Sequence, residues 1–200
     1  MNRFSIFITV FALFFSAYAF AETATWKIDA DHTSAHFSIQ HMVIAKVRGS
    51  FAGIQGKVTA DENNLTAAVV EATIPVATIN TNNARRDEHL RSADFFHAEK
   101  YPEMIFKSKK VTFGAAENTL NVVGDLTLHG VTREVELLVS GPTPAVTDPW
   151  GNTRRGAQAT TIINRKDFGL AWNKALETGG LLVGEEVDIV IDVELVREKN

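Results

Sequence analysis

The chain has 200 residues and no cysteine, and its 20 Lys and Arg against 24 Asp and Glu give a formal net charge of −4. The absence of cysteine excludes a disulfide framework and a thiolate metal site, so the fold depends on a buried core, which a chain of this length can form as one domain. The mildly acidic balance argues against a nucleic-acid-binding protein and against adsorption to an anionic membrane surface.

Residues 1–21 are predicted to be a secretory signal peptide. Arg3 supplies a positive start, an apolar run follows, and Ala19-Phe20-Ala21 provides the small residues of a cleavage site. A membrane anchor is the alternative, but the apolar run is short and no basic cluster follows it. We therefore expect an exported, soluble mature domain of residues 22–200, with 19 basic and 24 acidic residues and a net charge of −5.

Most of the mature chain alternates apolar and polar residues with the two-residue period of a half-buried β-strand. Clusters of turn-forming residues separate these segments, and His129-Gly130 joins two of them as a hairpin. The segments lie at 35–41, 65–76, 104–113, 119–130, 131–139, 157–165 and 187–196. In the last of them one face carries five apolar residues, Val187, Ile189, Ile191, Val193 and Leu195.

These patterns predict a mainly-β domain. No segment alternates strand with helix, so a parallel sheet is not expected. An open sheet of so many evenly spaced strands would have exposed edges, whereas closure into a barrel removes them. We therefore predict a single extended antiparallel β-barrel, with a β-sandwich as the alternative.

Three glycines, Gly49, Gly53 and Gly56, interrupt an otherwise strand-like stretch at 47–58. Glycine weakens a strand but permits the bend or bulge that a barrel corner needs. The apolar residues of this stretch favour a bent strand over an ordinary loop with a turn at each glycine.

A polar segment that ends on Phe95-Phe96 breaks the strand pattern and predicts a helical insertion around residues 82–98. Asn82 or Asn83 can cap its helix. The apolar face of this helix is too small for a core element. We expect it to lie across a mouth of the barrel, with the two phenylalanines pointing inward.

No complete catalytic or metal-binding set is visible. His32 and His36 with Asp29 or Asp31 could form a weak metal site, but hydrogen-bonded structural histidines are the simpler interpretation. An acid–base pair of His36 or His41 with either aspartate is the only enzymatic arrangement that the residues suggest. We predict no catalytic residues, no metal and no cofactor.

Several arginines and the many aromatic residues are candidates for ligand binding, although exposed arginines are commoner than anion sites. The basic side chains that could receive an anionic head group are Arg85, Arg86, Arg91, Arg154 and Arg155. An eight-stranded barrel is wide enough to hold one small ligand, although aromatic side chains can also fill it. Small residues at predicted inward positions favour an open interior, and these are Ala35, Gly124, Ala157, Ala159 and Thr161.

The sequence resembles a known family. The stretches that carry the resemblance are DADHTSAHFSIQHMVIAKVRGSFAGIQGKV, INTNNARRDEHLRSADFFHAEKYPEMIFKS, GDLTLHGVTREVEL and DPWGNTRRGAQATTIINRKDFGLAWNKALETGGLLVGEEVDIVIDVEL. Together they cover nearly all of the mature chain and are similar to the YceI-like family of bacterial periplasmic proteins. One departure is Ala157, where the family pattern has a large aromatic residue.

The resemblance implies a periplasmic protein with a lipocalin-like barrel and a long apolar tunnel for an isoprenoid lipid, of the polyprenyl or quinone type. It does not imply an enzyme. It assigns the tunnel wall and its helical cap to Phe37, Ile39, Phe51, Leu90, Phe95, Phe96, Phe106, Val122, Leu126, Ile163, Phe168 and Trp172.

Three functional hypotheses follow. The first is a carrier that sequesters such a lipid, with no integral membrane segment in the mature chain and no nucleic-acid partner. The second is an enzyme that acts on the lipid, and the third is a stress protein whose barrel is filled. A continuous cavity would separate the third from the others, and a converged acid–base pair beside it would favour the second. Pairing of two barrels as a homodimer is left open.

Overall fold

The computed structural model describes residues 23–177 and 179–199, so the predicted signal peptide lies outside the described part of the chain. The described residues are mainly β, as predicted. Their strands are β1 (Thr23–Ile28), β2 (Ser34–His41), β3 (Ala45–Phe51), β4 (Gln55–Asp61), β5 (Asn64–Pro75), β6 (Glu103–Phe113), β7 (Thr119–Leu128), β8 (Val131–Ser140), β9 (Val146–Thr147), β10 (Thr153–Asn164) and β11 (Val183–Arg197). Their helices are η1 (Val76–Thr78), α1 (Ala84–Arg91) and η2 (Arg165–Phe168).

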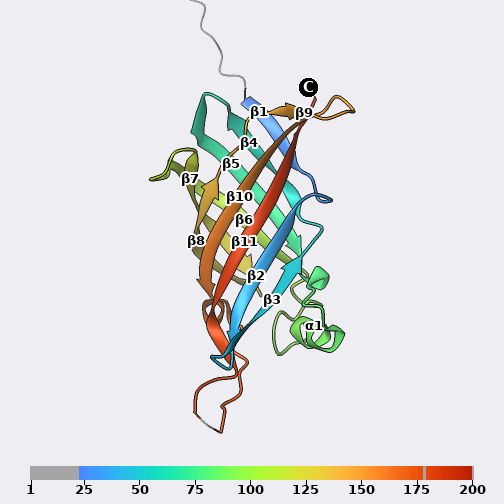
Figure 1. The fold of residues 1–200 in the computed structure, drawn as a ribbon, viewed down its shortest axis with the longest axis vertical. Coiled ribbons are helices and arrows are strands. Elements are labelled where there is room, and N and C mark those ends of the chain that lie inside the picture. The colour runs from blue at the N-terminus through green and yellow to red at the C-terminus, as the bar shows by residue number, and fades with distance from the viewer. Residues whose placement is uncertain (1–22, 178, 200) are drawn as a thin grey trace, which may run out of the picture.

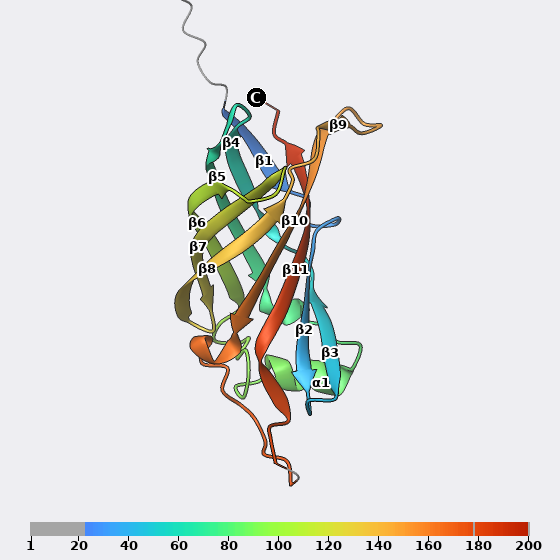
Figure 2. The same cartoon turned by 60° about the vertical axis from the view of Figure 1, so that its left-hand side comes forward.

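The strands form one antiparallel sheet that closes on itself. The order β11-β1-β4-β5-β6-β7-β8-β10 returns to β11 through the β10–β11 pairing, which makes an elongated eight-stranded barrel (Figures 1 and 2). This closure confirms the predicted barrel over the sandwich. We call the end that carries α1, at the bottom of Figure 1, the α1 end, and the end that carries β9 and the β4–β5 turn the β9 end.

Strand β11 runs the length of the barrel and has two partners on one side. It pairs with β1 near its C-terminal end, where Ile28 lies opposite Leu195, and with β2 from Val183 to Asp192. Strand β3 continues the sheet beyond β2 at the α1 end. The barrel is therefore extended toward α1 by these two strands.

The predicted bend between β3 and β4 is present. Three residues, 52–54, separate the two strands, and Gly53 has a left-handed φ of 68°. Before this bend the chain pairs with β2, and after it the chain pairs with β1 and β5. The stretch thus serves as one bent strand that changes partners, because a glycine adopts the positive φ without strain.

The hairpin predicted at His129-Gly130 joins β7 to β8. Both residues have positive φ, 54° and 74°, and Leu128 lies opposite Val131. A two-residue hairpin turn of this kind matches the twist of the flanking strands. A side chain at position 130 would also meet the ring of Tyr101, since an added Cβ would lie 2.5 Å from it.

The helical insertion is shorter than the predicted span of 82–98. Asn83 caps α1, with its side-chain oxygen 3.1 Å from the backbone nitrogen of Arg86. The helix ends at Arg91 because Ser92 adopts an extended conformation and its hydroxyl donates to the carbonyl of His89. Turns, not helix, carry the following residues through Phe95 and Phe96.

Buried hydrogen bonds fix the insertion to the segment before it. Thr81 donates both its backbone N–H, at 2.8 Å, and its hydroxyl to the carboxylate of Asp87, and both residues are buried. The guanidinium of Arg86 donates to the hydroxyl and carbonyl oxygens of Thr81. An isolated bridge between Ser50 and Asn80 then joins this unit to β3.

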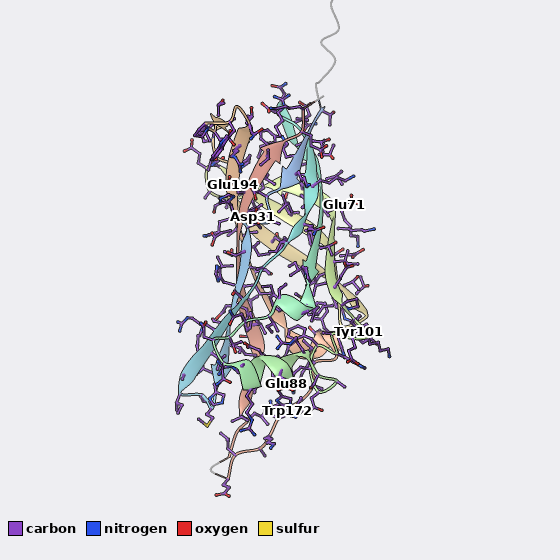
Figure 3. All side chains as sticks on the ribbon, turned by 90° about the vertical axis from the view of Figure 1, so that its right-hand side faces the viewer. Asp31, Glu71, Glu88, Tyr101, Trp172 and Glu194 are labelled. Atoms are coloured by element: carbon purple, nitrogen blue, oxygen red, sulfur yellow. The ribbon has the colours of Figure 1, made fainter. Side chains whose placement is uncertain are left out.

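We expect Asp87→Ala to destabilise the protein by about 1–3 kcal/mol, because the buried backbone N–H of Thr81 would lose its acceptor. The free energy of unfolding, measured in urea, tests this prediction. The neighbouring Glu88 is exposed and serves as a matched control (Figure 3), so Glu88→Ala should leave the stability within about 0.5 kcal/mol. Equal losses of stability in the two variants would contradict a stabilising role for the buried hydrogen bond from Thr81 to Asp87.

Among the described residues, no helix combines the length and apolar character needed to cross a membrane.

Candidate functional site

The interior of the barrel holds a cavity of about 470 Å³. Its wall draws side chains from the strands of the closed barrel, from β2 and β3, and from the insertion, and nearly all of them are apolar. This volume lies within the range of pockets that bind small molecules. The cavity argues against the hypothesis of a completely filled barrel.

Eleven of the twelve residues that the resemblance assigned to the wall lie at this cavity: Phe37, Ile39, Phe51, Leu90, Phe95, Phe96, Phe106, Val122, Leu126, Ile163 and Trp172. The exception is Phe168, which is buried in η2 and is not part of the lining. Strand β10 ends at Asn164, so the inward alternation that places Ile163 on the cavity does not extend to Phe168.

The list of wall residues missed much of the lining. The five apolar residues of one face of β11, from Val187 to Leu195, all reach the cavity, as does Trp26 on β1. The two-residue period had already placed those β11 residues on one face, so this signal was available in the sequence. Arg155 and Arg165 also line the cavity, and they share the two-residue period of Ala157, Ala159, Thr161 and Ile163, so the period places them inward although their charge disfavours that position.

Most of the small inward residues do leave space. Ala35, Ala157, Ala159 and Thr161 line the cavity, as expected for open positions. Gly124 does not, because the ring of Phe106 lies directly over it, and a Cβ built on Gly124 would be 2.5 Å from that ring. The space beside Gly124 is therefore filled by the Phe106 ring and does not belong to the cavity.

Aromatic rings close the cavity at the α1 end. Phe95, His89 and Trp172 form a cluster in which each pair of ring centroids is 5.0 Å apart. Phe96 packs edge-on against Phe51 at 5.7 Å. Figure 3 shows Trp172 beside the helix of the insertion. The polar insertion thus presents its two phenylalanines to the cavity, as predicted.

A buried arginine fastens the chain that follows η2. Arg165 is 3% exposed, and its guanidinium donates to the carbonyls of Gly184, at 2.7 Å, and Trp172, at 3.0 Å, and also to that of Leu170. Burial lowers the pKa of Arg165. Since these backbone carbonyls accept hydrogen bonds from the guanidinium, we assign Arg165 a structural role in positioning Trp172 at the cavity.

The acidic residues near His32 form an ion-pair network instead of a metal site. Asp29, His32 and Glu194 bring their ligand atoms within 4.8 Å of one another, but the guanidinium of Arg154 lies between the carboxylates. Arg154 also binds Asp148 at 2.7 Å. Its hydrogen bond lowers the pKa of Asp29 to about 2 and holds the pKa of Asp148 below its usual range.

This network predicts a loss of stability in acid. The pKa values of Asp29 and Asp148 are lower in the folded than in the unfolded chain, so their contribution is complete above pH 4 and is lost as the pH falls toward 2. We expect Arg154→Met to lower the urea midpoint at pH 7 and to flatten its decrease between pH 4 and 2. The exposed Arg133→Met is the control, and an identical pH profile in the two variants would contradict the prediction.

The acid–base pair of the enzyme hypothesis is not assembled among the described residues. His36 is exposed and contacts the hydroxyl of Ser34 at 2.9 Å, and Asp29 is bound by Arg154 and His32. The imidazole of His36 and the carboxylate of Asp29 are therefore directed to other partners.

Most of the predicted head-group arginines are also committed to protein partners. Arg86 donates to Thr81, and Arg91 donates to the carbonyl of Ile79. Arg154 belongs to the ion-pair network described above. Arg155 and Arg86 both line the cavity, but Arg155 differs because its buried Nε has no hydrogen-bond partner.

A family model described as the YceI-like domain matches residues 26–195 of the chain, inside the predicted domain of 22–200. The chain belongs to the YceI-like family. It is 38% identical to protein YceI of Escherichia coli O157:H7 over 205 residues, which covers 100% of both chains.

Solved structures agree with the YceI-like fold. A YCEI protein of Campylobacter jejuni is 29% identical, with a TM-score of 0.65 over 80% of this chain and 90% of that one. A polyisoprenoid-binding domain from Saccharophagus degradans is 15% identical, with a TM-score of 0.63 over 86% of this chain and 98% of that one. The second likeness extends to the fold alone.

Proposed function

We propose that this YceI-like protein is a periplasmic carrier or store that sequesters a long-chain isoprenoid lipid, of the polyprenyl or quinone type, inside its barrel. The observation that carries the proposal is the apolar cavity of about 470 Å³, whose lining runs from Glu62 in the β4–β5 turn to Trp172 at the α1 end. The polyisoprenoid binding of the structurally similar Saccharophagus degradans domain supports the same ligand class.

The hydrophobic effect supplies the affinity in this proposal. Each square ångström of apolar surface that leaves water contributes roughly 25 cal/mol. An isoprenoid chain is apolar along its whole length, and the cavity offers apolar contacts from every strand of the closed barrel. Many wall residues share the binding energy, so a single conservative substitution would have a small effect.

Binding without bond chemistry is the proposed mode of action. Sequestration requires a closed apolar interior and a means of access, and it requires no acid or base. The engagement of Asp29 by Arg154 and of His36 by Ser34 supports this proposal over catalysis. The periplasmic location is supported by the leader-like residues 1–21 and by the resemblance to a periplasmic family.

Native mass spectrometry of the protein, purified from the periplasm of its own host, tests the proposal. We expect a stoichiometric adduct, which organic extraction should identify as a polyprenyl or quinone species. A bare protein mass, together with no uptake of added isoprenoids, would overturn the proposed function.

A further inference from the structure

The β9 end of the cavity contains an arginine with an unusual environment. Arg155 lies on β10 and has the same inward orientation as Ala157 and Ala159, and all three line the cavity. Glu62, from the turn between β4 and β5, lines the cavity at the same end. Arg155 lies opposite Leu195 in the β10–β11 pairing. Figure 3 shows that the adjacent Glu194 lies at the end of the barrel opposite to Trp172.

The guanidinium of Arg155 is held in place by two contacts, but not all of its N–H groups have hydrogen-bond partners. It lies over the ring of Trp26, 5.1 Å from the centroid, which is the geometry of a cation–π contact. One terminal nitrogen is 3.4 Å from the carboxylate of Glu62. The Nε atom is fully buried, and within the described part of the chain it is the one buried side-chain nitrogen or oxygen that has no hydrogen-bond partner.

A buried N–H without an acceptor is costly, and such groups in native proteins call for a partner. The interior beside Arg155 is apolar, so the protein itself offers its Nε–H no oxygen there. Ala157, the next inward residue on β10, is small and also lines the cavity. An oxygen atom of a bound molecule would satisfy this donor.

The charge balance indicates what kind of oxygen would be preferred. Glu62 is Arg155's carboxylate partner, but its side chain is 40% exposed and water weakens this pair. The guanidinium side chain is 19% exposed. Its positive charge is therefore incompletely neutralised in a region of low polarity, which favours an anionic acceptor over a neutral one.

We propose that Arg155 binds the polar end group of the lipid, by donating its Nε–H to an oxygen of that group. The end group is an oxygen acceptor, either a phosphate or a quinone carbonyl, and the positive charge makes phosphate the stronger ligand. The lipid then lies with its head group at the β9 end and its tail toward Phe95 and Phe96. This inference rests on the proposed lipid-binding function.

Among the described residues, the α1 end has no buried side-chain donor that lacks a hydrogen-bond partner. Arg86 and Arg165 line the cavity there, but both donate to oxygen atoms of the protein. The remaining lining at this end is dominated by the aromatic cluster of Phe95 and Trp172. These surroundings suit an apolar tail, so the two ends of the cavity differ in the chemistry that they offer to a ligand.

Binding of three 20-carbon isoprenoids tests the role of Arg155. The probes are geranylgeranyl monophosphate, the alcohol geranylgeraniol and the hydrocarbon phytane, which differ in their oxygen acceptors. We expect Arg155→Met to weaken binding of the phosphate at least about tenfold and to leave phytane binding within about twofold. The outward-facing, exposed Arg48→Met is the matched control and should leave all three affinities unchanged.

A second variant gives a change in the opposite direction. Glu62→Gln removes the competing carboxylate, so we expect it to strengthen binding of the phosphate several-fold and to leave phytane binding unchanged. Equal losses for phosphate and phytane in Arg155→Met, or no loss for either, would overturn the proposed head-group contact.

The orientation of the lipid has an independent readout. A short-tailed isoprenoid quinone quenches tryptophan fluorescence at short range. Trp26 contacts Arg155 at one end of the cavity, and Trp172 lies at the α1 end. We expect stronger quenching in a variant that retains only Trp26 than in one that retains only Trp172. The reverse order would overturn the inference while leaving lipid binding intact, whereas absence of binding to the unmodified protein would overturn the proposed function itself.

Discussion

Replacing Ala159 with tryptophan is expected to weaken lipid binding strongly without unfolding the protein. Ala159 lies in β10, is buried, and points into the cavity. An indole at this position would occupy space that an apolar chain needs, and the cavity of about 470 Å³ would accept it with less strain than a close-packed core would. We expect the affinity for a long isoprenoid to fall at least about tenfold.

The control for this prediction lies on the same strand. Ile162 is 63% exposed and faces away from the cavity, so Ile162→Trp adds the same side chain to the outer surface. Circular dichroism establishes that both variants are folded, and isoprenoid titration measures their affinities. Equal affinities in folded Ala159→Trp and Ile162→Trp would show that the lipid does not occupy this part of the barrel.

The alternation of residue types was sufficient to predict the walls of the barrel. The apolar face of 187–196 became the inward face of β11, and its partner β10 follows the same period from Ala157 to Ile163. The hairpin at His129-Gly130 was equally predictable. Its turn needs two consecutive residues with positive φ, and this requirement concerns only the turn residues themselves. Such features depend on neighbouring residues alone.

Features that depend on contacts between distant residues were not predictable. Gly124 has an inward position, but Phe106 of the adjacent strand occupies its space. The unpaired Nε of Arg155 results from the joint placement of Trp26, Glu62 and the β10 backbone, which are far apart in the sequence. The length of α1 within the predicted insertion of 82–98 depends on the hydrogen bond of Ser92 to the preceding turn, which ends the helix at Arg91.

Phe168 shows why a wall and a core are difficult to distinguish by residue type. Phe96 and Phe168 are both large apolar residues that were assigned to the wall, but only Phe96 borders the cavity. Phe168 is 2% exposed and belongs to the main cluster of buried residues, together with Leu128 and Leu170. Its position follows from the helical turn η2, where the two-residue period of β10 no longer applies.

We expect Phe168→Ala to have the largest effect on stability of the substitutions considered, a loss of about 3–5 kcal/mol in the free energy of unfolding. The phenyl ring is enclosed on all sides, so its removal leaves a new cavity in addition to the lost burial. Phe113→Ala is the control, because Phe113 is 69% exposed and its loss should cost less than about 0.5 kcal/mol. Urea unfolding measures both.

The same variant separates stability from binding. Phe168 does not line the cavity, so folded Phe168→Ala, assayed at low temperature, should bind isoprenoids with nearly unchanged affinity. Phe96→Ala should lower the affinity for isoprenoids and have a smaller effect on stability, because it widens a cavity that already exists and removes a contact with the ligand. A strong loss of affinity in the folded Phe168→Ala variant would place Phe168 in the binding site. In that case η2 would have a different conformation in the lipid-bound protein.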